Sequence, residues 1–203
     1  MVALGIGSVL FIFRTDTNSE DIPLQNNQNN SMATTETVIS FLGVEYYMPL
    51  PEQNVPGSDY TALFKEVLPL GEAFDNWTSM ITSQRLTPLS AGPEISAESY
   101  TNNLLDMHRT QGAQILETTV LSNPEWETVG IDTSNPPYLL IFVYNIPQTT
   151  QAEFSIATIR NNPAGHVDAL IYSKQLPQVD VPAFLESQEY GEARIGVATM
   201  EWF

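Results

Sequence analysis

The side chains best suited to chemistry in this sequence are its two histidines, each of which has a carboxylate two positions away. His108 follows Asp106 in "DMH", and His166 precedes Asp168 in "HVD". On a helix such neighbours point about 200° apart and cannot chelate one ion, whereas on a strand they share a face. If the strand of His166 and Asp168 packs beneath the helix of His108, the three side chains form a His₂–carboxylate set that suits zinc. The alternative places His108 at the edge of the core with its hydrogen bonds satisfied, and leaves the other two solvated beside a turn.

Four aromatic side chains are the second candidate for a functional site, because large aromatic residues on a surface can line the rim of a groove that binds a peptide or a glycan. They are Tyr46, Tyr47, Trp77 and Trp126. Tryptophan packs in cores more often than it faces a ligand. The alternative is therefore that Trp77 closes the edge of the fold, between an acidic turn and a Thr/Ser-rich segment, in "GEAFDNWTSMITSQRL" (71–86).

Signatures of nucleotide and cofactor chemistry are absent from the sequence. It contains no G-x-x-x-x-G-K, G-x-G-x-x-G, G-x-S-x-G or H-E-x-x-H motif. It also has no cysteine, which excludes disulfides, thiolate metal sites and cysteine nucleophiles. A serine–histidine–aspartate set would have to use one of the two histidines, and no spacing favours one. We expect no cofactor, and the alternative to a binding protein is a metal-dependent or hydrolytic enzyme using His108, His166 and Asp168.

The charge of the chain limits its partners. The sequence has 24 Asp and Glu residues against 7 Lys and Arg, a net charge of −17. Such a surface repels phosphate backbones and anionic membranes, because it has no basic stripe to neutralise them. Acidic surfaces confer solubility and favour cations or basic proteins. We therefore expect no nucleic-acid partner, and contact with a membrane only through the N-terminal segment.

The first 37 residues have the pattern of a tether. Residues 1–14 contain the apolar run "VALGIGSVLFIF", which is shorter than the roughly 20 residues that span a bilayer but fits a signal peptide or a short anchor. Residues 15–37 are mostly Asn, Gln, Thr, Ser and acids, the composition of a disordered linker. We expect an exported or membrane-tethered, extracytoplasmic protein. The alternatives are a first strand for the apolar run and a cytosolic protein with a disordered tail.

Residues 38–203 are predicted to form a single α+β domain, a mostly antiparallel sheet covered by two helices. Most of its segments are β-branched and aromatic and are bounded by turn residues, which is typical of strands. The expected strands are "VISFLGVEYYM" (broken at Gly43), "YTALFKEVLPL", Trp77–Leu86, "QILETTVL", "YLLIFVYNI", "EFSIATIR" and "HVDALIYSKQL". Because "YLLIFVYNI" is apolar on both faces, we expect it to be a central strand covered on both sides.

The two helices are predicted from caps and spacing. In "SAESYTNNLLDMHRTQG", Ser96 is placed to cap the start of a helix and Gly112 to follow its end. A shorter helix is expected after Asp180, ending at Gly191, and "RIGVATMEW" (194–202) is expected to be a closing strand.

The words "YYMPLP", "GEAFDNWTSMITSQRL", "ILETTVL" and "HVDALIYSKQL", in this order and with a helix after the second, also carry a resemblance. Its most specific residues are Asn76, Trp77, Thr78, Thr82 and Gln84. Over 38–203 the chain resembles the PsbP/Mog-type α/β/α sandwich, and it is similar to small exported bacterial proteins. Such relatives are mostly accessory or binding proteins of assemblies, so the resemblance implies a non-enzymatic module with a protein partner at the cell envelope. The chain has only two lysines, so the basic docking surface of photosynthetic PsbP proteins is not carried over.

Overall fold

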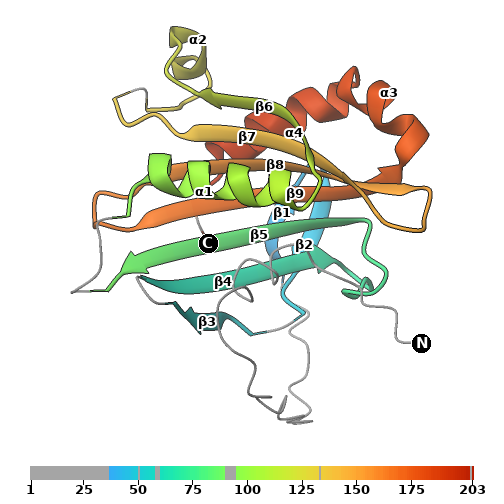
Figure 1. Cartoon of the computed structure of the whole chain (residues 1–203), viewed down its shortest axis with the longest axis horizontal. Coiled ribbons are helices and arrows are strands. Elements are labelled where there is room, and N and C mark those ends of the chain that lie inside the picture. Colours follow the sequence, from blue (N-terminus) through green and yellow to red (C-terminus); the bar gives the residue numbers. More distant parts are fainter. Residues whose placement is uncertain (1–36, 50, 58–59, 90–94, 133, 202) are drawn as a thin grey trace.

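The computed structural model describes residues 37–49, 51–57, 60–89, 95–132, 134–201 and 203 (Figure 1). The predicted leader (1–14) and linker (15–37) lie outside the described residues, apart from Thr37, with which the first strand begins. Within the described ranges, no helix is both long enough and apolar enough to cross a membrane.

In the part of the chain that the structure describes, the strands form one nine-stranded sheet in the order β1-β2-β4-β5-β9-β8-β7-β6, with β3 beside β4. Their bounds are β1 (Thr37–Phe41), β2 (Val44–Tyr47), β3 (Gln53–Pro56), β4 (Tyr60–Pro69), β5 (Ser79–Pro88), β6 (Gln114–Val120), β7 (Tyr138–Asn145), β8 (Gln151–Asn161) and β9 (Val167–Pro177). Every pairing between these strands is antiparallel. The prediction of an α+β fold built on a mostly antiparallel sheet is confirmed.

Helices lie on both faces of the sheet (Figure 1). They are α1 (Ala97–Thr110), the short α2 (Pro124–Glu127), α3 (Val181–Leu185) and α4 (Gln188–Thr199), with a 3₁₀ turn (Gln178–Asp180) before α3. The helix α1 packs on β6, β7 and β8, while α4 packs on β8 and β9 from the other side. We call these two faces the α1 side and the α4 side.

The strand β7 shows why both faces are covered. Leu140 and Phe142 point into the apolar core of the α1 side, and Leu139 and Ile141 point into that of the α4 side. The alternation expected of a strand therefore buries apolar groups on both faces, as the sequence predicts. The middle of the sheet is nevertheless formed by β5 and β9, since β7 lies next to the edge strand β6.

The first long helix begins and ends where its caps predict. The Ser96 hydroxyl accepts a hydrogen bond from the Ser99 amide at 3.1 Å, and the Ser99 hydroxyl in turn accepts one from the Ser96 amide at 3.0 Å. These two bonds satisfy amides that the first turn of a helix leaves without partners. At the other end, Gly112 directly follows the last cap residue, Gln111.

The end of the described chain differs from the prediction. Residues 188–199 form the helix α4 and not a strand, and Gly191 lies inside this helix instead of ending a shorter one. The Ser187 hydroxyl accepts a hydrogen bond from the Tyr190 amide at 3.1 Å and so starts the helix. Ala193 and Val197, one turn apart, are then buried against the sheet. The sequence of this segment predicts a strand because apolar residues alternate with others. In the fold, however, its buried residues are spaced as on one face of a helix.

Candidate functional site

A pocket of about 430 Å³ lies on the α4 side, at the end of the sheet where β5 and β8 end and β9 begins. Its lining comes from these three strands, the β8–β9 turn, the last turn of α4, and Gly130, Ile131, Asp132, Asn135 and Pro137. Its volume falls in the range of small-molecule sites. The turn is a tight hairpin: the Asn162 backbone N–H donates to the His166 carbonyl at 2.8 Å, and Gly165 adopts a positive φ of 84°.

Three charged side chains form a row across the pocket. Arg85 of β5 is the register partner of Asp168 of β9, and Asp168 is the register partner of Arg160 of β8. Directly opposed residues of antiparallel strands project from the same face. Since Val167 and Ala169 belong to the α1-side core, Asp168 and its two partners face the α4 side.

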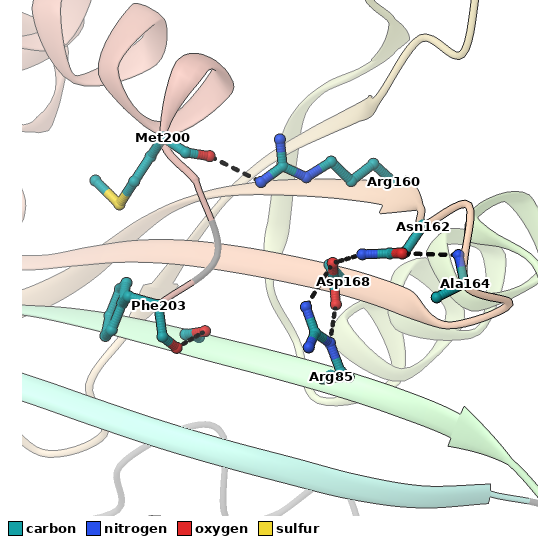
Figure 2. Close-up of polar contacts among 8 residues, drawn as sticks. Arg85, Arg160, Asn162, Ala164, Asp168, Met200 and Phe203 are labelled. Atoms are coloured by element: carbon teal, nitrogen blue, oxygen red, sulfur yellow. Dashed lines mark hydrogen bonds and ion pairs between the residues drawn. The ribbon is translucent and has the colours of Figure 1, made fainter.

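Asp168 is the centre of this row and is held from two directions (Figure 2). The Arg85 guanidinium donates from Nε to Oδ1 at 2.7 Å and from Nη2 to Oδ2 at 3.2 Å. The side chain of Asn162 donates from Nδ2 to Asp168 Oδ2 at 2.8 Å, and its Oδ1 accepts a hydrogen bond from the Ala164 backbone N–H. The Asp168 side chain is buried, and the paired guanidinium and amide supply the hydrogen bonds that a buried carboxylate needs.

Arg160 is oriented differently from its neighbour in the row. Its Nη2 donates to the carbonyl of Met200, the C-cap of α4, at 2.9 Å, and Figure 2 shows the side chain extending towards Met200 and away from Asp168. A cation is favourable at this end of a helix. Within the described ranges Arg160 forms no ion pair, whereas every other lysine or arginine there has a carboxylate partner: Lys65, Arg85, Arg109, Lys174 and Arg194.

The wall of the pocket that lies outside the sheet carries an exposed carboxylate, that of Asp132. The Ser134 hydroxyl and amide donate to Asp132 Oδ1 at 2.6 and 2.9 Å, and these hydrogen bonds lower the pKa of Asp132. Asn135 ties this wall to the sheet by donating from Nδ2 to the Asn161 carbonyl at 2.8 Å. The pocket therefore presents one cation that no described carboxylate pairs with and one exposed anion, beside a neutralised Arg85–Asp168 pair.

The predicted metal ligands do not come together. His108 lies on the α1 side, where it stacks on Phe142 with ring centroids 3.9 Å apart and hydrogen-bonds the Tyr144 hydroxyl. Burial lowers the pKa of His108 to about 4, so the ring is neutral at pH 7. Asp168 faces the other side of the sheet, and His166 Nδ1 is buried with no hydrogen-bond partner among the described residues. In the described ranges no three histidine or carboxylate side chains are grouped to hold a metal ion.

The aromatic residues also adopt the alternative arrangement. Tyr46 and Trp77 are 1% and 4% exposed, so neither can line the rim of a groove. The Tyr46 hydroxyl shares a hydrogen bond with Ser79 at 2.8 Å, and that of Tyr47 donates to Glu45 at 2.9 Å. Trp126 is partly buried, with the guanidinium carbon of Arg194 5.5 Å from its ring centroid. Tyr46 and Trp77 therefore pack in the core, as the alternative for Trp77 predicts, whereas Tyr47 and Trp126 are partly exposed.

The sequence analysis did not single out Arg85, Arg160 or Asn162. One signal was present in the sequence: cations are scarce in this chain, yet both arginines stand at the ends of apolar strand segments, "SQRL" and "ATIR". No family model matches the chain, and no curated protein matches it significantly in sequence. The geometry of the pocket is thus the main guide to function.

Proposed function

We propose that this chain is a non-enzymatic binding module that holds a small polar ligand in the pocket of Arg85, Asp168 and Arg160. The observation that carries the proposal is the row of opposed charged side chains on three adjacent strands at the base of this pocket. Strands of a wide sheet move little relative to one another, so they hold such groups at fixed separations. Preorganised groups reduce the entropic cost of binding.

The hydrogen bonds of Asp168 favour recognition over proton transfer. A general base needs an oxygen that can approach the proton of a substrate. Both oxygens of Asp168 instead accept hydrogen bonds, from Arg85 and from Asn162. The carboxylate therefore serves to position Arg85, and the pocket offers charge and hydrogen bonds for holding a ligand.

We further propose that the module is an accessory protein of the PsbP/Mog type that acts with a protein partner at the cell envelope. The order of layers supports this, because α1 covers one face of an antiparallel sheet and α3 and α4 cover the other. The apolar and polar segments at 1–14 and 15–37 have the composition of a leader and a tether.

Native mass spectrometry of the full chain, isolated from the cells that produce it, tests the proposal. We expect the wild type to retain a bound small molecule that the Arg160→Met variant loses, while a control variant, Arg109→Met on the exposed surface of α1, keeps it. A wild-type chain that carries no additional mass, even after mild cross-linking in the cell, would contradict a binding role. Cross-linking before isolation also captures the protein partner for identification.

A further inference from the structure

We infer that the pocket takes a small amino-acid-like zwitterion, whose carboxylate binds Arg160 and whose ammonium group lies towards Asp132. This inference rests on the proposed function and names the class of its ligand. It follows from the charges of the two walls, from the contacts that leave them available, and from the net charge of the whole chain.

The carboxylate seat is indicated by the contacts of Arg160. In a chain with a large excess of acids, the other described cations are all paired, and this arginine forms no ion pair with any described carboxylate. Its nearest candidate, Asp168, is occupied by Arg85 and Asn162. One contact, to the Met200 carbonyl, orients the guanidinium through Nη2. A guanidinium has five N–H donors, so donors remain for a two-point contact with a carboxylate.

The ammonium seat is indicated by the wall outside the sheet, which carries Asp132. Asp132 is exposed, and both hydrogen bonds from Ser134 fall on Oδ1. The carboxylate of Asp132 is therefore available to a positive group of the ligand.

The net charge of the chain selects a zwitterion over a simple anion. A charge of −17 creates a field that disfavours the approach of any net anion, even one that fits Arg160. A zwitterion brings a carboxylate without net charge. The volume of about 430 Å³ holds a molecule of this size and leaves room for its side chain or for bridging waters.

The experiment measures binding of the twenty L-amino acids to the full chain. Each is added at about 10 mM, enough to detect millimolar affinity, and the shift in thermal midpoint is recorded. Hits are titrated by calorimetry beside two analogues, one without the amino group and one without the carboxylate. The variants are Arg160→Met, Asp132→Asn and the control Arg109→Met.

We expect at least one amino acid to bind the wild type and the control equally. Arg160→Met should weaken it about 10- to 100-fold, the effect of losing hydrogen bonds to a charged group, and Asp132→Asn should weaken it by less. Both analogues should bind more weakly than the parent. If Arg160→Met does not fold, Arg160→Lys keeps the charge and should bind with intermediate affinity.

Two results would overturn the inference. The first is that the analogue without the amino group binds as tightly as the amino acid, which would show that the ammonium group has no binding site. The second is the absence of any shift with all twenty amino acids. If native mass spectrometry nevertheless finds a different small molecule whose retention needs Arg160, the proposed function stands and only the ligand class fails.

Discussion

Two titratable side chains on the α1 side of the sheet have pKa values displaced in opposite directions by burial. Glu66 of β4 shares this face with Ala62 and Phe64, and burial raises the pKa of its carboxyl from 4.5 to about 7. His108 of α1 is buried, and desolvation lowers its pKa from 6.5 to about 4. In both cases the low-dielectric surroundings disfavour the charged form.

The two groups should contribute opposite pH dependences of stability. Between pH 4.5 and 7 folded Glu66 keeps a proton that the unfolded chain has released, so its contribution lowers the free energy of unfolding as the pH rises. Between pH 4 and 6.5 the unfolded chain protonates His108 and the folded protein does not, so this contribution raises the free energy of unfolding as the pH rises. The opposing slopes overlap and partly cancel in the wild type.

Single substitutions should separate these slopes. Relative to the wild type, Glu66→Gln should gain stability as the pH rises from 4.5 to 7, because it removes the carboxylate whose ionisation is disfavoured. His108→Gln should show the opposite trend from pH 4 to 6.5. Urea unfolding at several pH values measures both, and using differences from the wild type removes the contribution of the other acids. A difference independent of pH for Glu66→Gln would show that Glu66 titrates normally.

At the scale of elements, α4 lies against the β1–β2 hairpin as well as against the middle of the sheet. The contact is close at Gly196, where an added Cβ would lie 2.4 Å from Phe41 Cε2. Phe41 ends β1 and is buried on the α4 side. A glycine inside a helix costs stability, and here the missing side chain allows the helix and the hairpin to pack. Gly191, in the same helix, has nothing within 4 Å of its added Cβ.

The two glycines should respond oppositely to substitution by alanine. Gly191→Ala should raise the free energy of unfolding by about 0.5–1 kcal/mol, the helix propensity gained in open space. Gly196→Ala should lower it by about 1–3 kcal/mol, since it overpacks the contact with Phe41. Chemical unfolding measures both changes. If Gly196→Ala is stabilising too, Phe41 can move away and the contact does not determine the position of α4.

At the scale of the whole molecule, folding brings the charged groups of a chain with a net charge of −17 closer together than they are in the unfolded chain. The described ion pairs involve five of the seven cations, so most carboxylates have no cationic partner and repel one another. Self-repulsion of this kind destabilises a compact state and is weakened by salt. Surface ion pairs are weakened as well, but each contributes little.

The protein should therefore become more stable as salt is added. Raising sodium chloride from about 0.01 M to about 1 M shortens the Debye length from about 30 Å to about 3 Å. We expect the thermal midpoint to rise over this range. Choline chloride at equal ionic strength is the control, since an equal rise excludes specific binding of sodium. A falling midpoint would mean that the ion pairs outweigh the repulsion.

Local patterns in the sequence are enough to predict much of this fold. The caps of α1, the β8–β9 hairpin turn and the two apolar faces of β7 each depend on residues within a few positions of one another. Hydrogen bonds of caps and turns, and the alternation of strands, are short-range properties of the chain. The α+β class follows from the same patterns.

The pocket and the last helix were decided only by the tertiary structure. Arg85 and Asp168 are 83 positions apart, and strand register alone brings them and Arg160 into one row. The segment at 194–199 alternates like a strand but folds as part of α4, because Ala193 and Val197 fill the core at helical spacing. His108 and Asp168 were separated onto opposite faces for the same reason. Register and choice of face depend on contacts between distant segments, which no local pattern contains.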